Sequence, residues 1–414
     1  MSTPDGSVDV GAFSLFTGEH GARPFSLYAR LRSIGAVVPL SGATGGARGR
    51  AWVVTRMEEA MQVLKDSARF TVDPRSVGVG RAFGQAVSGS ADTTGFFSQG
   101  SMLTVDEPDH RRLRGLVSKA FTPRYMEGLR PRVQAIADEL LDRVQRQGRM
   151  DVVEDYALPL PINVISDMLG VPPEDRAQVR AWSGALASSL GRRQEGISAP
   201  MRAFVEYAAQ LVAEKRLHPA GDLVSRLVAI EEEGDRLSEV ELLSMITLLI
   251  FAGHETTSHL IATGTLMLLE HPDQLATLSA NPGLIPSAVE EMLRLNGPAS
   301  TTGPRFATVD VEIAGQRIEK GDLVVVALLS ANHDETLFTE PEELDVGRTQ
   351  GRNLAFGHGI HACLGAPLAR LEGDIAFTTL LRRMPDLRLA VPLEAITWHV
   401  TLNNPSLDAL PVAF

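Results

Sequence analysis

Between residues 108 and 270, one helical sequence pattern follows another. Apolar residues recur at intervals of three and four, which places them on one face of a helix. The patterns cover six segments: 111–120, 131–147, 161–169, 173–190, 201–217 and 238–270. The middle of the chain is therefore predicted to be an all-helical core.

Strand-like patterns flank this helical stretch. Alternating apolar residues at 51–55 predict a hairpin ahead of a helix that starts near Met57. Further runs that resemble strands occur at 309–318, 322–329, 387–390 and 398–402. One more long helix is expected after Cys363. We therefore expect a mainly α fold with minor β-sheets.

The sequence contains no internal repeat, low-complexity linker or charge block that would mark a second unit. Residues 1–414 are therefore predicted to form a single domain. Within it we expect a small β-rich lobe from about 1–70 with parts of 305–330 and 385–414. The helical core is expected from about 105–300 and 353–384.

Charge and cysteine content argue against several classes of protein. The formal net charge is −12, which disfavours binding to nucleic acid or anionic lipid. Cys363 is the only cysteine, so no disulfide forms within the chain, as suits a reducing cytoplasm. Residues 1–21 lack the basic and apolar regions of a signal peptide. The most apolar stretch, 243–253, is shorter than the roughly 20 residues that span a bilayer. We expect a cytoplasmic protein without a membrane anchor.

The segment 353–371 places the single cysteine in a glycine-rich loop directly before an amphipathic helix. Glycines adopt positive φ readily and let backbone amides approach a flat ligand. The N-terminus of the helix adds the positive end of its dipole beside the sulfur. Both effects favour a thiolate, and a thiolate ligand promotes O–O cleavage at a haem iron. A lone cysteine is otherwise most often a small buried apolar residue.

This loop resembles the haem-binding signature of the cytochrome P-450 family. The residues that carry the likeness fall in one short run: Phe356, Gly357, Gly359, His361, Cys363 and Gly365. The resemblance implies the cytochrome P-450 fold, a triangular prism of long helices with a small β-rich lobe. It also implies a haem b cofactor whose iron is bound by the Cys363 thiolate. It spans nearly the whole chain, in the order and spacing of the soluble bacterial branch.

A charged pair in a helical context supports this resemblance. Glu291 and Arg294 lie three residues apart, so their side chains share one helical face. Alone, such a pair is most simply interpreted as a solvated surface pair. The resemblance identifies it with the family's ExxR motif instead. That motif implies a buried structural pair, completed by Arg348, which serves folding and haem retention.

The segment 251–257 interrupts an otherwise apolar helix. Ala252 and Gly253 are small, and Glu255 and Thr256 are polar groups that need partners when they are buried. One interpretation is a helix that leaves the core at this point. The resemblance implies the family's oxygen-binding groove, with Ala252 and Gly253 beside the haem. Glu255 and Thr256 would then be the acid and alcohol that deliver protons to bound dioxygen.

The haem carboxylates would also need partners, because two buried propionates require cations or strong hydrogen-bond donors. His110 and Arg114 lie four residues apart on one helical face, and Arg305 precedes a predicted strand. His361 lies two residues before Cys363. Each of the four matches a propionate partner in the family pattern, although His110 or Arg305 alone would more often be a surface group.

The function that the resemblance implies is a monooxygenase that inserts one atom of dioxygen into a hydrophobic small molecule. A polyketide or macrolide, a terpenoid, a steroid or a fatty acid would suit it. Substrate contacts are expected from five segments: 71–103, 181–198, 248–252, 299–302 and 401–404.

Electrons must come from another protein, because one cysteine cannot hold an iron–sulfur cluster and no flavin module is visible. A ferredoxin or flavodoxin with its reductase is expected. A basic patch that would steer an acidic ferredoxin is predicted at Arg111, Arg112, Arg352 and Arg370.

Two alternatives remain at this point. A cysteine-nucleophile hydrolase would need a histidine base near Cys363, and His358 and His361 are close in the sequence. A non-catalytic haem-binding carrier or sensor would keep the haem without the chemistry. Such proteins usually lack the acid and alcohol, so Glu255 and Thr256 argue against this second alternative.

Overall fold

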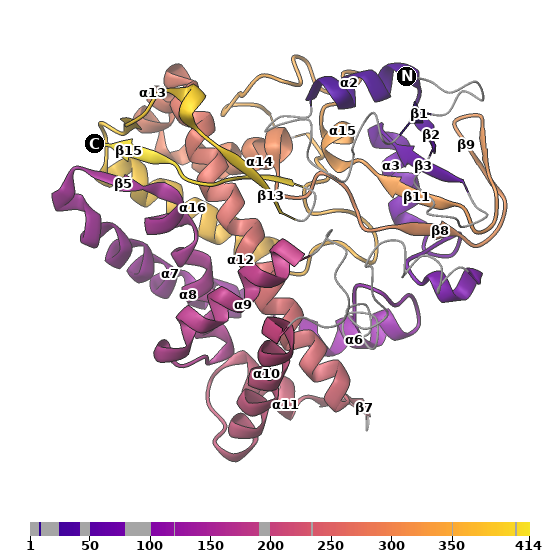
Figure 1. Ribbon diagram of the computed structural model, residues 1–414, viewed down its shortest axis with the longest axis horizontal. Helices are drawn as coiled ribbons and strands as arrows, with labels where there is room; N and C mark the ends of the chain where they lie inside the picture. Colours follow the sequence, from indigo (N-terminus) through magenta and orange to yellow (C-terminus); the bar gives the residue numbers. More distant parts are fainter. Residues whose placement is uncertain are drawn as a thin grey trace.

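Helices make up most of the molecule, and most strands gather on one side of it (Figure 1). The structure is a computed structural model that describes residues 8–9, 25–41, 50–78, 101–119, 121–189, 199–232, 235–349, 351–401 and 404–414. The prediction of a mainly α fold with minor β-sheets is confirmed.

All six predicted helical segments are helical, with shifted ends. The helices are α2 Phe25–Ile34, α3 Met57–Lys65, α6 Asp109–Ser118, α7 Pro123–Val144, α8 Pro159–Leu169, α9 Arg176–Ser189, α10 Ala199–Leu217, α11 Leu223–Ala229, α12 Glu239–Glu270, α13 Pro272–Ala280, α14 Ile285–Asn296, α15 Leu328–Asn332 and α16 Ala366–Arg383. The start predicted at Pro131 is wrong, because α7 begins earlier and continues through this proline. The Thr122 hydroxyl caps α7 by accepting a hydrogen bond from the Tyr125 N–H.

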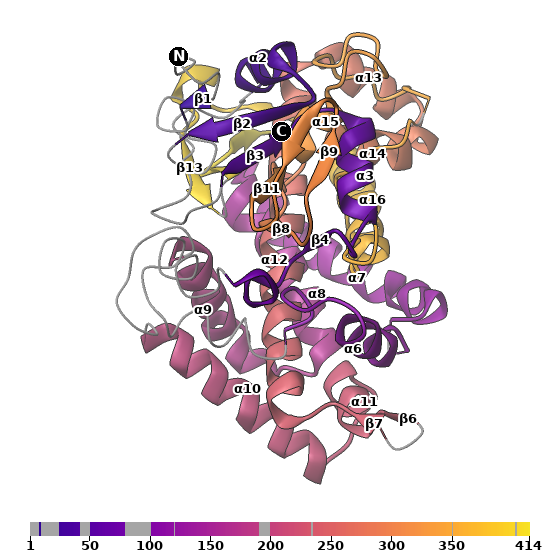
Figure 2. The same ribbon diagram turned by 90° about the vertical axis from the view of Figure 1, so that its right-hand side faces the viewer.

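Helix α12 is the longest of the described helices and crosses the middle of the molecule (Figures 1 and 2). Ser238 and Glu241 start it with a capping box, in which each side chain accepts a hydrogen bond from the other residue's N–H. Helices α8, α9, α10, α14 and α16 pack against it. Its apolar residues are therefore buried over most of its length. None of the described helices is both long and apolar enough to cross a lipid bilayer.

The main sheet has the strand order β1-β2-β3-β11-β8-β4. Strands β3 and β11 are parallel neighbours in its centre, and every residue of both is buried. Alternate residues face opposite sides: Val53 packs in the cluster that contains residues of α2, and Val54 in the cluster that contains residues of α3. The strands are β1 Val8–Asp9, β2 Val37–Ser41, β3 Ala51–Val54, β4 Phe70–Thr71, β8 Arg305–Ala307 and β11 Leu323–Val326.

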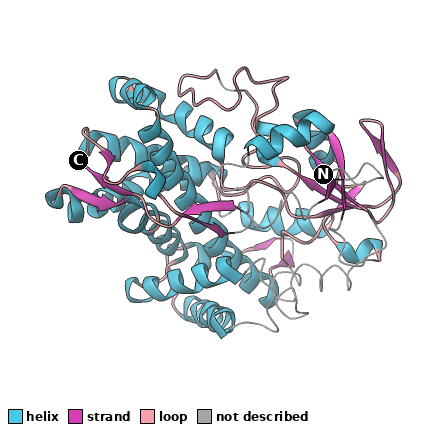
Figure 3. Cartoon of the chain, turned by 45° about the horizontal axis from the view of Figure 1, so that its top comes forward, coloured by secondary structure: helices cyan, strands magenta, loops and turns pink. Residues whose placement is uncertain are grey.

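The strands near the C-terminus do not join this sheet, although parts of 385–414 were expected in the same β-rich lobe. β12 Arg388–Leu389 and β15 Pro411–Ala413 form a sheet with β5 Arg149–Asp151, beside the helical core. β13 Trp398–Thr401 and β14 Asn404–Leu407 form a separate hairpin, whose strands contact α9 and α12. Figure 3 shows these strands apart from the N-terminal ones. Two further hairpins are β6 Glu231–Glu232 with β7 Asp235–Arg236, and β9 Val311–Ile313 with β10 Gln316–Ile318.

Candidate active site

Backbone hydrogen bonds fix the loop that carries Cys363. The N–H of Cys363 donates to the Phe356 carbonyl at 2.8 Å, and the N–H of Gly357 donates to the Leu354 carbonyl at 2.8 Å. Gly365 is the residue at which α16 begins. The sulfur therefore lies beside the N-terminus of α16, as the sequence predicts.

Two glycines of this loop have a left-handed backbone. Gly357 has a φ of 68° and Gly359 has a φ of 76°, a region that other residues enter only at a cost. Gly359 also packs against the end of α3, because a Cβ on it would lie 2.1 Å from the Leu64 carbonyl oxygen. The loop thus needs glycine at 359 for both conformation and space.

The Cys363 side chain is accessible to solvent. Desolvation by the surrounding protein raises the pKa of its thiol, whereas the N–H groups of Gly365 and Ala366 and the Arg114 guanidinium lower it. In the described part of the chain, no hydrogen bond joins this thiol to His358 or His361. The histidine base that a hydrolase would need is therefore not in place.

His110, Arg114 and His361 meet beside the cysteine loop. Nη1 of Arg114 donates to the Ala362 carbonyl at 2.6 Å. The rings of His110 and His361 contact each other edge to face, with centroids 4.3 Å apart. His110 is buried, and none of the described residues forms a hydrogen bond with its Nε2. Burial and the neighbouring charges lower the pKa of His110 to about 4, so its ring is neutral at pH 7.

Arg305 is only 6% exposed, and none of the described residues forms a hydrogen bond or ion pair with its guanidinium. Burial lowers the pKa of Arg305, and the charge of Asp106 opposes this effect. Asp106 in turn lies 3.5 Å from Nε2 of His361 and accepts hydrogen bonds from Thr71 and from the N–H of Val72. Asp106 was not predicted as a site residue from the sequence, although its position four residues before His110 could have indicated it.

Within α12, Thr256 forms a hydrogen bond backward to the preceding turn of the helix. Its Oγ1 donates to the Ala252 carbonyl at 2.7 Å. Ala252 is exposed, and Gly253 and Thr256 are partly exposed, in a helix that is otherwise mostly buried. Because Ala252 and Thr256 are one turn apart, they form a small accessible patch on one face of the helix.

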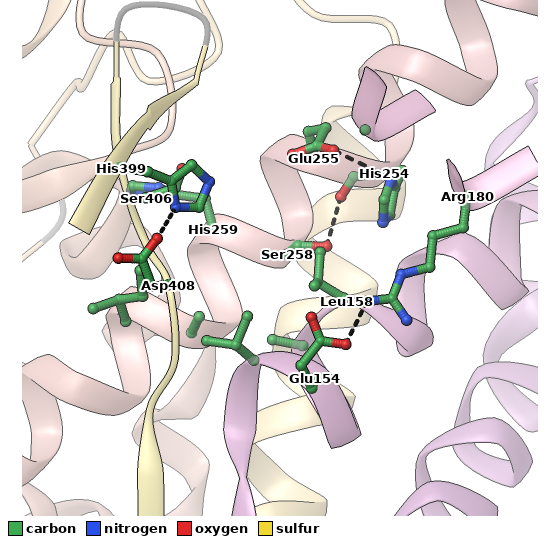
Figure 4. Close-up of a pocket in the computed structure, with 15 residues that line it drawn as sticks. Glu154, Leu158, Arg180, His254, Glu255, Ser258, His259, His399, Ser406 and Asp408 are labelled. Atoms are coloured by element: carbon green, nitrogen blue, oxygen red, sulfur yellow. Dashed lines mark hydrogen bonds and ion pairs between the residues drawn. The ribbon is translucent and has the colours of Figure 1, made fainter. Parts of the chain in front are cut away.

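Glu255 lines a different space from Thr256. Its carboxylate lies 3.7 Å from Nδ1 of His254 and borders a pocket of about 260 Å³ that also contains His399 and Arg180 (Figure 4). Desolvation raises the pKa of Glu255, although His399 and Arg180 lower it in part. The structure thus does not bring the Glu255 carboxylate and the Thr256 hydroxyl into contact.

Glu291, Arg294 and Arg348 form a buried cluster. Both oxygens of Glu291 accept hydrogen bonds from Arg294, at 2.7 and 2.8 Å, and Oε1 also accepts one from Arg348 at 2.9 Å. Arg294 further donates to the carbonyls of Asn332 and Pro341. Burial would raise the pKa of Glu291, but the two guanidinium groups hold it below its ordinary value.

Comparisons with known proteins show which family the chain belongs to. A sequence model described as Cytochrome P450 matches residues 283–385. Cytochrome P450 CYP107DY1 of Priestia megaterium is 46% identical over 372 residues, which are 88% of this chain and 90% of the relative. The chain belongs to the cytochrome P450 family. The polyketide biosynthesis cytochrome P450 PksS of Bacillus subtilis is 41% identical over 94% of this chain and 95% of the relative.

A solved P450 structure is similar over almost the full length. The myxobacterial cytochrome P450 CYP267B1 in complex with myristic acid has a TM-score of 0.86 and 41% identity, and the match covers 97% of this chain and 98% of that one. This P450 is therefore a haem-dependent monooxygenase that inserts one atom of dioxygen into a hydrophobic small molecule. Of the segments expected to contact substrate, 79–100, 190–198 and 402–403 lie outside the described residues.

Proposed function

We propose that Cys363 binds the iron of a haem b as a thiolate, while His110, Arg114, Arg305 and His361 hold the haem carboxylates. The buried Arg305 guanidinium carries this proposal, because a buried cation that forms no hydrogen bond or ion pair with the described residues is costly unless an anion comes to it. Nε2 of His110, which has no hydrogen-bond partner among the described residues, supports it further. The haem that we propose is haem b. Covalent attachment as haem c would need two cysteines in addition to Cys363, and Cys363 is the only cysteine in the chain.

Small residues leave room for the flat group on both sides. We infer that Gly357 borders it on the cysteine side, and that Ala252 and Gly253 border it on the α12 side. No described atom lies within 4 Å of a Cβ built on Gly357. Phe356 is held by Arg370, whose guanidinium lies 4.4 Å from the centre of the ring. These contacts position the loop before any ligand binds.

The bound haem would activate dioxygen with two electrons and two protons, so that one oxygen atom enters the substrate and the other leaves as water. The proton source that we propose is Glu255, whose raised pKa keeps its carboxyl protonated closer to neutral pH than in an ordinary glutamate. Thr256 donates its only hydroxyl hydrogen to Ala252. Its oxygen lone pairs are therefore free to hold a water molecule on the accessible patch.

The substrate that we propose is a polyketide or a long-chain fatty acid. The relative from Bacillus subtilis is named for polyketide biosynthesis, and the myxobacterial structure contains myristic acid. Two of the segments expected to contact substrate lie wholly within the described residues, 248–252 of α12 and 299–302 ahead of β8. These segments consist of apolar and small residues without a charge, as a neutral hydrophobic ligand requires.

The redox partner that we propose is a ferredoxin or flavodoxin, with a docking surface around Arg352. Three arginines of the predicted patch already have acidic partners: Arg111 with Glu107, Arg112 with Glu241 and Arg370 with Glu290. Among the described residues, Arg352 forms no ion pair, and its Nη1 donates a hydrogen bond to the Met61 sulfur at 3.6 Å. Arg352→Glu is expected to slow reduction by an acidic ferredoxin and to weaken its salt dependence more than Arg111→Glu does.

The absorbance of the reduced protein under carbon monoxide tests the haem ligand. We expect the strongly red-shifted Soret band of thiolate ligation. Cys363→Ala should remove this band, and His358→Ala, a change in the same loop, should leave it in place. A band at the position typical of histidine ligation in the unaltered protein would contradict the proposal.

A further inference from the structure

The pocket beside Glu255 is lined by residues from four separate parts of the chain (Figure 4). These are one π-helical turn at Val153–Ala157, helices α9 and α12, and the β13–β14 hairpin with the residue that follows it. It has a volume of about 260 Å³, enough for several water molecules. Its lining is rich in titratable groups, yet none of them is a proposed haem contact, and only Glu255 has a proposed role.

Two ion pairs lie on opposite sides of this pocket in Figure 4. Nη2 of Arg180 donates to Glu154 at 2.6 Å, and Nδ1 of His399 lies 2.7 Å from Oδ1 of Asp408. The side chains of His399 and Asp408 are 49% and 44% exposed. His399 and Asp408 are therefore accessible to bulk water and also line the pocket.

The three histidines of the pocket differ in what they can do. His254 and His259 are buried, and desolvation lowers the pKa of each to about 4. Both are therefore neutral near pH 7 and cannot supply a proton as imidazolium. Ser183 lies 3.5 Å from His254, and the Asn296 carbonyl lies 3.2 Å from His259, so these rings also have structural neighbours. Only His399 among the three is exposed.

Glu255 connects this pocket to the accessible patch of α12. Its carboxyl lines the pocket, with 16% of the side chain exposed, and its neighbour Thr256 belongs to the patch with Ala252. Two adjacent residues thus face different spaces: Glu255 lines the solvent-linked pocket, and Thr256 lies at the proposed oxygen site.

We propose that the pocket is the proton entrance of this enzyme, and that His399, held by Asp408, is the relay residue that supplies Glu255 from solvent. Protonated His399 gives its Nε2 proton to pocket water, and a water proton forms the O–H bond on the Glu255 carboxylate. Bulk water then protonates His399 again. Two such transfers are needed in each turnover. The electrons come from the redox partner, so no pocket residue is oxidised or reduced. This inference rests on the role proposed for Glu255.

The first test uses the haem-containing enzyme with His399→Gln, and His218→Gln as the control. Glutamine keeps a polar side chain beside Asp408 but cannot carry a proton. His218 is also exposed but does not line the pocket. An infrared titration follows the protonated carboxyl band that Glu255→Gln removes. Loss of the His399 charge should raise the pKa of Glu255 without any turnover, and His218→Gln should leave it unchanged.

Turnover gives the second reading. We expect His399→Gln to lower product formed per dioxygen consumed by up to about tenfold, less than the roughly 10²–10⁴-fold typical of a direct general acid. The solvent deuterium isotope effect should increase. A purely structural role for His399 would change neither the infrared titration nor the isotope effect.

A third variant fills the pocket without removing a titratable group. Gly184 of α9 lines it, and a Cβ on Gly184 meets no described atom within 4 Å. Gly184→Leu should reproduce the loss of coupling, whereas Gly184→Ala should keep wild-type coupling. Wild-type values in both His399→Gln and Gly184→Leu, with the thiolate spectrum intact, would overturn the proton entrance alone. Absence of that spectrum from the unaltered protein would overturn the proposed haem site instead.

Discussion

The hydroxyl of Thr256 donates a hydrogen bond to the carbonyl of Ala252, 2.7 Å away and one turn earlier on α12. Both residues are accessible in a helix that helices surround on several sides. The bond holds the Thr256 hydroxyl against the helix backbone, with its oxygen at the surface of the patch. We therefore expect the Thr256 hydroxyl to take part in the reaction rather than in the packing of the helix.

Thr256→Ala is therefore expected to separate oxygen consumption from product formation. Without the hydroxyl, water at the patch loses its anchor, and product per dioxygen should fall by about tenfold or more. Haem content and the carbon monoxide spectrum should stay normal, because no hydrogen bond joins Thr256 to the described residues of the cysteine loop. Thr256→Ser keeps the hydroxyl and should retain most of the coupling. Equal coupling in the alanine and serine variants would remove Thr256 from proton delivery.

Glu291→Gln is expected to destabilise the fold strongly. The substitution leaves the buried Arg294 without its carboxylate, and Arg348 also loses its partner. Breaking a buried ion pair in this way costs about 3–5 kcal/mol. Urea unfolding at pH 7 measures the loss. Glu290→Gln is the matched control, because the neighbouring Glu290 pairs with the exposed guanidinium of Arg370; a similar loss in both variants would contradict the importance of the buried cluster.

The same cluster predicts a pH dependence of stability. Because the pKa of Glu291 is lowered in the folded state, its contribution is fully present above the unfolded value of about 4.3 and is lost as the pH falls through the folded pKa. Unfolding free energies measured from pH 6 downwards should therefore fall more steeply in the unaltered protein than in Glu291→Gln. Parallel curves would show that Glu291 does not contribute in this way.

The helices could be predicted because their signals are local. The pattern at 238–270 needed only its own residues, and α12 follows it within one residue. Strand β5 gave no such signal, since three residues show no period and its partner β15 lies near the other end of the chain. Pro131 misled the sequence analysis for another reason: proline favours a helix start, but the cap at Thr122 decides where α7 begins.

The geometry of the candidate site could not be predicted from the sequence. The sequence placed Glu255 and Thr256 together, and only the structure shows that the two side chains line different spaces. The role of His399 could not be predicted from the sequence. It lines the same pocket as Glu255, but it belongs to a hairpin more than 140 residues later in the chain. Likewise, three of the four arginines in the predicted patch have acidic neighbours, one of which, Glu241, is far away in sequence.

A pair of alanine substitutions separates conformation from packing in the cysteine loop. Gly357→Ala should cost about 1–2 kcal/mol, the usual penalty for a left-handed residue with a Cβ. Gly359→Ala should cost clearly more, because its Cβ would also lie 2.1 Å from the Leu64 carbonyl oxygen. Urea unfolding compares the two. Equal losses would mean that the end of α3 moves aside without cost.

Arg305→Met tests whether this buried cation serves the haem or the fold. A guanidinium that is 6% exposed and has no described partner destabilises the haem-free protein. Methionine should therefore make the haem-free protein more stable to urea, by at least about 1 kcal/mol. The haem-containing protein should release haem to apomyoglobin roughly tenfold faster or more, since a charged hydrogen bond contributes about 1.5–3 kcal/mol. Arg305→Lys keeps a positive charge and should fall between the two. If Arg305→Met destabilised both forms equally, the residue would serve the fold and the carboxylate role would be wrong.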